Sequence, residues 1–340
     1  MRELAIAAAD ELALSELGIS VVGLLGKGHF GSVLLGERSD GTAVAVKVAL
    51  RLDREAATLK VMEGDAGFPS LLHYKKRGGG SRNELLVMER LGPSLQSLWE
   101  EIGPACFSAP TVLHIGRGAL RCLKRLHFAG VVHNDIKPAN LVLPANTGGS
   151  ALGDGAAAAA VEVMLIDFGI STRAQDVIRC DDAPPTMRQP LEVCRVPAEP
   201  SATYDSDLKM YVAPIGTPDF ASIKQHERSL TSAVDDVESL VYCLTYLAAG
   251  DLPWRDLPQP QQLQWKRELM TRGWDALCDG WDGEAAERLL RGSDVSEALR
   301  RVWAEVMASQ ASDAEADPKA VDHDACVAAL WRAQPQREQE

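Results

Sequence analysis

The sequence lacks a segment that would cross a membrane. Its richest apolar run, residues 240–249, is too short to span a bilayer and is interrupted by Tyr242 and Thr245. A signal-peptide pattern is also missing, because acidic residues interrupt the small apolar stretch at the N-terminus. No internal repeat is visible. We therefore expect no membrane partner.

Paired cysteines are lacking as well. The seven cysteines are scattered without CxxC pairs or metal-ligand spacing, and their odd number argues against a disulfide framework. This pattern favours a reducing compartment, so we expect the protein in the cytoplasm, the nucleus or both.

Positive charge is in deficit, with 35 Lys and Arg residues against 48 Asp and Glu residues and a net charge of −13. This balance argues against a general binder of nucleic acid, and we expect no nucleic-acid partner. An acidic substrate would have to be bound by a local basic patch rather than by the field of the whole molecule.

The chemistry that is present centres on residues 130–142. Two apolar residues lead into a polar loop and two more lead out, and Asp135, Lys137 and Asn140 lie between them. They supply a carboxylate to orient a hydroxyl, a cation to neutralise a transferring phosphoryl group and an amide oxygen to hold a metal. Phosphoryl transfer needs this set, because the protein contributes positioning and charge stabilisation rather than covalent chemistry. The alternative, a polar turn with these residues by chance, leaves the other motifs of the chain unexplained.

A glycine-rich loop between two expected strands offers a place for phosphates. Because β-branched residues and a second strand follow it, rather than a helix, a Rossmann dinucleotide fingerprint is excluded. Val33 and Ala45 are expected above an adenine ring, and Lys47 is the candidate cation for the α- and β-phosphates. The loop residues that would close over the nucleotide are Gly26, Lys27, Gly28, His29, Phe30 and Gly31.

A helix expected over residues 51–63 would carry Glu55, the candidate partner that orients Lys47. Only eight residues separate the two, which leaves little room for a strand end, a turn and the first helical turn. A surface Glu55 that pairs with another Lys or Arg is therefore the alternative.

The two remaining parts of a nucleotide site lie at strand ends. Near Glu89 a strand breaks into a linker whose free backbone groups can read an adenine edge, with Met88 at the back of the pocket. Asp167 ends a hydrophobic strand and is followed by Phe-Gly. Because Mg²⁺ prefers oxygen ligands, Asn140 and Asp167 are the expected metal ligands.

Other segments are less informative. Residues 144–160 resemble a low-complexity insertion, and residues 172–212 form a long proline-rich loop. Asp236 falls in the first turn of a predicted helix, where it can brace the central loop or simply favour the helix N-terminus. A further helix is expected from Trp265 to Leu277.

These motifs resemble those of protein kinases and, within that superfamily, of casein kinase I. Residues 89–95 are close to the family's Glu-Leu-Leu-Gly-Pro-Ser-Leu, and Ala221-Ser222-Ile223 stands where most kinases have Ala-Pro-Glu. The general kinase signature comprises residues 26–33, Val44-Ala45-Val46-Lys47, His133-Asn134-Asp135 to Asn140, and Asp167-Phe168-Gly169.

The resemblance implies an α+β, bilobal fold. A small antiparallel β-rich N-lobe would span residues 18–91 and a larger, mainly helical C-lobe residues 92–335, with ATP between them. The kinase domain, residues 18–335, would follow a lead-in of residues 1–17 that forms a short helix or is frayed. It would contain the insertion at 144–160 and a long activation segment at 167–223.

The resemblance also implies transfer of the γ-phosphoryl group of ATP, with Mg²⁺ as cofactor, to Ser or Thr of protein substrates. We expect a monomer. The residues implied as catalytic are Asp135, Lys137, Lys47, Glu55 and Thr217. Those implied to bind ATP are the glycine loop, Val33, Ala45, Lys47, Met88, Glu89, Leu91 and Val142. Those implied to bind metal are Asn140 and Asp167.

Departures from the family pattern shape the expectations. Asn134 replaces the Arg that normally receives an activation-loop phosphate, which predicts activity without loop phosphorylation. Pro258 replaces a Lys that helps to bind phosphate-primed substrates, which argues against that specificity. Two alternatives remain: a pseudokinase scaffold that binds nucleotide without catalysis, and a small-molecule kinase. The substrate-facing segment 216–223 speaks against the second.

Overall fold

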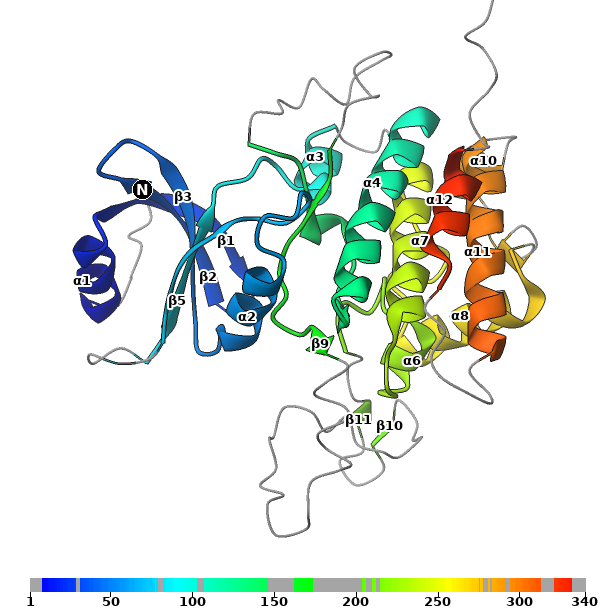
Figure 1. Cartoon of the computed structure of the whole chain (residues 1–340). Coiled ribbons are helices and arrows are strands. Elements are labelled where there is room, and N and C mark those ends of the chain that lie inside the picture. Colours follow the sequence, from blue (N-terminus) through cyan, green and yellow to red (C-terminus); the bar gives the residue numbers. More distant parts are fainter. Residues whose placement is uncertain are drawn as a thin grey trace, which may run out of the picture.

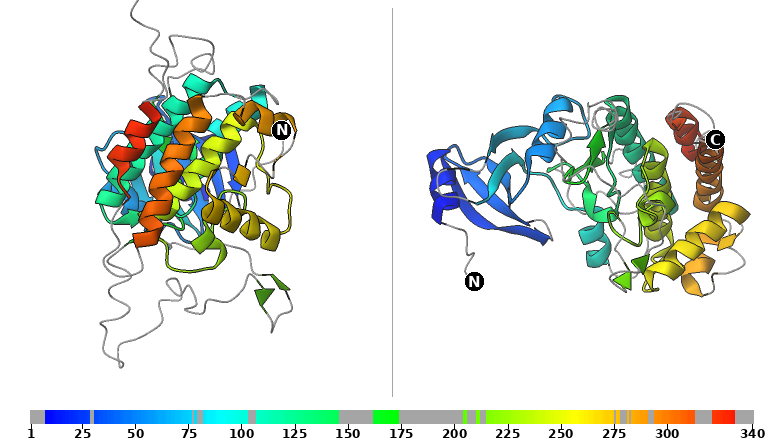
Figure 2. Two further views of the ribbon diagram at one scale, coloured as in Figure 1. Left: turned by 90° about the vertical axis from the view of Figure 1, so that its right-hand side faces the viewer. Right: turned by 90° about the horizontal axis from the view of Figure 1, so that it is seen from below.

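The computed structural model shows two lobes joined by a linker (Figure 1). The expected α+β arrangement, with an antiparallel sheet at the N-terminal end and helices at the C-terminal end, is confirmed. The view from below in Figure 2 shows the two lobes side by side. The structure describes residues 8–28, 31–76, 78, 82–102, 107–145, 162–173, 204–205, 210–211, 215–274, 276–277, 281, 283–290, 294–312 and 321–331.

A five-stranded sheet forms the N-terminal lobe, with every neighbouring pair antiparallel and the strands in the order β1-β2-β3-β5-β4. The central position of β3 places Lys47 in the middle of the lobe. The strands are β1 (Ile19–Gly28), β2 (Gly31–Arg38), β3 (Ala43–Ala49), β4 (Leu71–Lys75) and β5 (Glu84–Glu89), and the helices are α1 (Ala8–Glu16) and α2 (Asp53–Val61).

The alternation of side chains along β3 gives the sheet two different faces. Val44 and Val46 pack in one cluster with Ala13 and Leu14, so α1 covers the outer face. Ala45 and Ala49 lie on the opposite face and pack in the cluster that contains Ala56 and Leu59 of α2. Strand periodicity therefore places Lys47 on the face that packs against α2.

The second lobe is built around α7, which is buried along almost its whole length and packs against α4, α10 and α11. The carboxylate of Asp235 accepts the backbone N–H of Ser232 at 2.8 Å and begins this helix. The helices of the lobe are α3 (Leu95–Ile102), α4 (Ala109–Phe128), α6 (Ile223–His226), α7 (Ala233–Ala249), α8 (Gln259–Arg272), α10 (Glu284–Leu290), α11 (Asp294–Ser312) and α12 (His323–Trp331), with one 3-10 turn, η1 (Pro138–Asn140).

Three short strand pairs lie between the lobes or at the edge of the helical lobe. They are β6 (Val131–Val132) with β9 (Thr172–Arg173), β7 (Leu141–Val142) with β8 (Met164–Leu165), and β10 (Tyr204–Asp205) with β11 (Met210–Tyr211). The first two pairs flank the central loop and so determine where its side chains lie.

One helix differs from the sequence prediction. α8 runs from Gln259 to Arg272, not from Trp265 to Leu277. Pro260 is accommodated in the first turn, because the N–H that it lacks has no partner inside the helix at that position. Most of the expected insertion at 144–160 and of the expected long loop at 172–212 lies outside the described residues. Among the helices that the structure describes, none has the length and apolar character of a bilayer-crossing segment.

Candidate active site

Lys47 is bound by two carboxylates, one from each lobe. Its Nζ lies 2.6 Å from Oε2 of Glu55 on α2 and 2.6 Å from Oδ1 of Asp167, which follows β8. Glu55 is therefore not the surface carboxylate of the alternative interpretation. The short connection suffices because Glu84 of β5 accepts the N–H of Leu52 at 2.7 Å, which places the start of α2 against the sheet.

Burial and charge act together on the ionisation of this trio. Burial alone would lower the pKa of Lys47, but the carboxylates of Glu55 and Asp167 raise it above its ordinary value. Burial raises the pKa of Glu55 to about 7, against the opposing charge of Lys47. Burial would also raise the pKa of Asp167, but the Lys47 cation lowers it. The site therefore keeps a cation beside an ionised carboxylate, which suits it to phosphates and metal.

Asp135 belongs to a second cluster, on the side of the second lobe. Its Oδ1 accepts the hydroxyl of Thr217 at 2.8 Å, and its Oδ2 lies 2.7 Å from Nζ of Lys137. Lys137 also donates to the Thr217 hydroxyl at 2.9 Å, so the three side chains form a closed ring. The approach of the Thr217 loop needs glycine, because Gly216 has φ +86° and a Cβ there would lie 2.6 Å from the carbonyl oxygen of Asn134. The loop thereby holds the carboxylate in one orientation.

The two expected metal ligands lie at the ends of paired strands. Asn140 precedes β7 and Asp167 follows β8, and these strands pair antiparallel, with Leu141 opposite Leu165. The amide nitrogen of Asn140 donates to the backbone oxygen of Asp135 at 2.8 Å. Its amide oxygen and Oδ2 of Asp167 accept no hydrogen bond from the residues that the structure describes. These free oxygens fit a hard cation such as Mg²⁺.

Asp236 of α7 supports the backbone of the central loop. Its two carboxylate oxygens accept the N–H groups of His133 at 2.7 Å and Asn134 at 2.9 Å. His127 of α4 lies 2.8 Å from one of these oxygens. Burial alone would raise the pKa of Asp236, but the hydrogen bond and charge of His127 lower it. The contact is the brace that the sequence suggested.

Asn134 adopts a left-handed backbone conformation, with φ +69°, and is buried. Its amide nitrogen lies 3.1 Å from both the carbonyl oxygen of Ile170 and the hydroxyl of Thr172. Its amide oxygen accepts the hydroxyl of Thr231 at 2.6 Å. Uncharged partners thus occupy both ends of the side chain.

The residues expected around an adenine fall on one face of the sheet and on the linker. Ala45 lies opposite Met88 on the neighbouring strand, and Val33 lies opposite Lys47. The N–H of Leu91 has no partner among the described residues and is free to bind a base edge.

The other linker and floor residues are tied to their surroundings. Glu89 binds the hydroxyl of Ser70 at 3.1 Å. Val142 of β7 pairs with Met164 and bridges to Ser94, which places it on the opposite side of the linker from the sheet.

The glycine loop connects β1 to β2. Gly26, Lys27 and Gly28 end β1, whereas His29 and Phe30 lie outside the described residues. Gly31 has φ +150°, and a Cβ there would lie 2.2 Å from the carbonyl oxygen of Val48. Glycine at this position therefore lets the loop lie flat against β3.

A buried lysine that the motifs did not reveal fixes the segment facing Asp135. Lys266 of α8 donates to the carbonyl oxygens of Pro218 at 2.8 Å and Ala221 at 2.7 Å, and lies 3.0 Å from Nε2 of His226. Burial lowers the pKa of Lys266 to about 7, against the charges of Glu238 and Asp219.

Further buried side chains complete this anchoring of residues 216–223, which we call the platform. Gln225 donates to the carbonyl oxygen of Asn134, and Glu238 accepts the N–H of Ile223 at 2.8 Å. A sequence signal existed only for Lys266, because it falls at helical spacing between the buried Leu263 and Leu269.

Comparisons with known proteins agree with this geometry. A family model of the protein kinase domain matches residues 19–186. The casein kinase 1-like protein HD16 of Oryza sativa subsp. japonica is 30% identical over 253 residues. That match covers 68% of this chain and 30% of the rice protein, so the chain spans less than a third of the length of that relative.

Proposed function

Because this chain belongs to the protein kinase family and is similar to a casein kinase 1-like protein, we propose that it phosphorylates Ser or Thr residues of protein substrates with ATP. The observation that carries the proposal is the contact of 2.6 Å between Lys47 and Glu55. A connection too short for Lys47 to reach Glu55 would favour a pseudokinase, and the contact speaks against that reason for one.

The residues of the chain divide the work of phosphoryl transfer. Lys47, held by Glu55, binds the phosphates of ATP from above, and the Leu91 N–H binds the base. Asp135 accepts a hydrogen bond from the acceptor hydroxyl and orients it toward the γ-phosphorus. Lys137 lies 2.7 Å from Asp135 and can neutralise the charge that develops on the transferring group.

Asn140 and Asp167 would hold Mg²⁺, which supplies charge neutralisation at the β- and γ-phosphates when it is bound. Both residues lie next to the groups that position the nucleotide and the hydroxyl. Asp167 also binds Lys47 at 2.6 Å. One of the proposed metal ligands is therefore in direct contact with the proposed phosphate-binding cation.

We further propose that the activity does not require phosphorylation of the activation segment. The position that would carry an arginine holds Asn134, whose amide is occupied by Ile170, Thr172 and Thr231. A neutral, occupied side chain offers no binding site for a phosphate. Phosphatase-treated protein is expected to retain its activity, and a loss on treatment would contradict this part of the proposal.

The test of the function is label transfer from γ-labelled ATP to casein, with and without Mg²⁺, for the wild type and for Asp135→Asn. The variant keeps the size of the side chain and removes its charge. We expect metal-dependent transfer to Ser and Thr, reduced about a hundredfold or more in the variant, because a positioned general base contributes about 10² to 10⁴ in rate. Each tenfold corresponds to about 1.4 kcal/mol of barrier. Wild-type transfer no greater than that of the variant, with nucleotide still bound, would support the pseudokinase instead.

A further inference from the structure

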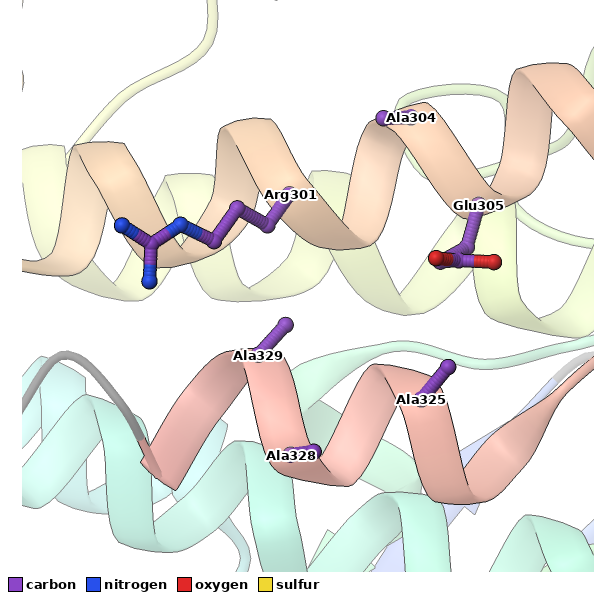
Figure 3. Close-up of a pocket in the computed structure, with 6 residues that line it drawn as sticks. All are labelled: Arg301, Ala304, Glu305, Ala325, Ala328 and Ala329. Carbon is purple, nitrogen blue, oxygen red and sulfur yellow. The ribbon is translucent and has the colours of Figure 1, made fainter.

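The last described helix, α12, packs between α4 and α11 (Figure 1). Toward α11 it presents small side chains across a shallow groove (Figure 3). The groove is lined by Ala325, Ala328 and Ala329 of α12 and by Arg301, Ala304 and Glu305 of α11.

Polar contacts also join α12 to α4. Near its C-terminal end, the guanidinium of Arg117 donates to the carbonyl oxygen of Leu330 at 3.2 Å. Near its N-terminal end, Lys124 forms an ion pair with Asp324 at 2.6 Å. As the numbers rise along α4, those of the partners fall along α12. The two helices are therefore antiparallel.

The contact nearest the start of α12 continues into the active site. Nε2 of His323 lies 2.8 Å from Nδ1 of His127, and Nε2 of His127 lies 2.8 Å from the Asp236 carboxylate. That carboxylate accepts the N–H groups of His133 and Asn134. A continuous path of hydrogen-bonding groups thus runs from α12 to the residues just before Asp135.

Burial makes this path matter energetically. The side chains of His127 and Asp236 are 3% and 1% exposed. With Nε2 used for Asp236, Nδ1 of His127 depends on His323, its one partner among the described residues. A buried ring nitrogen without a partner costs about 1 to 3 kcal/mol, so removing His323 would favour a rotation of His127 away from Asp236.

We propose that His323 is a positioning residue for the catalytic loop. Through His127 it holds the Asp236 carboxylate against the N–H groups of His133 and Asn134, and so links the docking of α12 to the placement of Asp135. The effect on catalysis rests on the proposed kinase function, whereas the effect on the loop backbone does not.

The test compares three variants of the full chain. His323→Ala removes the imidazole, and His323→Gln places an amide where Nε2 lies. Lys124→Ala is the matched control, because it breaks a neighbouring contact of the same helix pair without touching the path. Amide hydrogen exchange at His133 and Asn134, measured without nucleotide, reports the loop. Steady-state kinetics with ATP and casein report the function.

We expect His323→Ala to speed exchange of these two amides about tenfold, whereas Lys124→Ala leaves it unchanged and His323→Gln restores most of the protection. In the kinetics, His323→Ala should lower kcat about tenfold while the KM for ATP stays within twofold.

Equal exchange in His323→Ala and the wild type, or equal acceleration in His323→Ala and Lys124→Ala, would overturn the proposal. A wild type that transfers no phosphate but shows the expected exchange pattern would refute the kinase function and leave the positioning role of His323 intact.

Discussion

Two buried lysines, one in each lobe, are stabilised in opposite ways. Lys47, on the nucleotide side, lies between two carboxylates at 2.6 Å. Lys266, on the platform side, donates to two carbonyl oxygens and lies beside an imidazole; among the described residues it forms no ion pair. The carboxylates raise the pKa of Lys47 despite its burial, whereas burial lowers that of Lys266 to about 7.

The difference indicates what each lysine is for. Lys47 keeps a positive charge, which can bind an incoming phosphate while its carboxylate partners remain in contact, so we expect its role to be electrostatic. Lys266 uses the three N–H groups of its ammonium on acceptors within the protein, so its role is to hold backbone in place. Substitutions should therefore separate them, one acting on catalysis and the other on stability and substrate binding.

The largest effect is expected for Lys47→Met. It removes the cation proposed to bind the phosphates, and loss of one such preorganised group costs about 10² to 10³ in rate. The free energy of unfolding should change less than the activation free energy, because Glu55, with its pKa of about 7, can take up a proton once its partner is gone. Phosphate transfer and chemical denaturation measure the two effects. The control is Lys75→Met on β4, which breaks an exposed pair with Glu16 of α1. It should leave both phosphate transfer and the free energy of unfolding unchanged.

Lys266→Met is expected to have the reverse signature. The carbonyl oxygens of Pro218 and Ala221 lose their donor, which should lower the unfolding free energy by about 2 to 3 kcal/mol. The KM for a protein substrate should rise more than the KM for ATP, because only the platform is released. Denaturation and steady-state kinetics measure these changes.

Arg267→Ala is the matched control for Lys266→Met. Arg267 follows Lys266 on α8, and its pair with Glu227 is solvent-exposed on the arginine side, so its loss should cost about 0.5 kcal/mol or less. If the two substitutions destabilise the protein equally, the proposed role of Lys266 is wrong.

The same contrast explains what the sequence could predict. The nucleotide side is assembled from short motifs, in which Asp135, Lys137 and Asn140 occur within a few residues. The place of Lys47 on the strand after the glycine loop indicated a phosphate-binding cation before any contact was known. Its pairing with Glu55 remained open, because it depends on where α2 begins, and Glu84 of a later strand determines that start.

The contacts that anchor the platform and the catalytic loop could not be found in this way, because they join residues far apart in the chain and of ordinary types. Lys266 reaches Ala221 across 45 positions, and His127 reaches His323 across 196. A lysine on a helix is usually solvent-exposed, and only its place among buried leucines distinguished this one. The early start of α8 was missed for a local reason, since Pro260 is unfavourable inside a helix but not in its first turn.

A smaller effect is expected on the nucleotide side from Gly31→Ala. The new Cβ would lie 2.2 Å from the carbonyl oxygen of Val48, at a φ of +150° that other residues rarely adopt. Such strain costs about 1 to 3 kcal/mol, and the loop should relieve it by lifting from β3. The KM for ATP should then rise several-fold with little change for the protein substrate.

Gly23→Ala in β1 serves as the control, because a Cβ built there would make only an ordinary contact, with Leu35 Cβ at 3.8 Å. Kinetics with ATP as the varied substrate compare the two variants. Equal KM values would show that the position of Gly31 against β3 is not what the nucleotide requires.

The smallest effect concerns the charge of Lys266 and is measured as the pH dependence of the free energy of unfolding. Burial and the neighbouring Lys266 cation lower the pKa of His226 to about 3, below its ordinary value near 6.5. Between these values the unfolded chain binds a proton that the folded protein does not, so the unfolding free energy falls as pH drops below about 6.5. The slope from this residue approaches about 1.4 kcal/mol per pH unit.

Denaturation at pH 7, 6 and 5 measures this slope. The free energy of unfolding should fall less steeply in His226→Asn than in the wild type, and as steeply as in the wild type in His73→Asn, an exposed histidine of β4. An unchanged slope in His226→Asn would mean that the folded protein and the unfolded chain protonate His226 alike, so that neither burial nor the Lys266 cation lowers its pKa. That result would contradict a charged Lys266 beside His226.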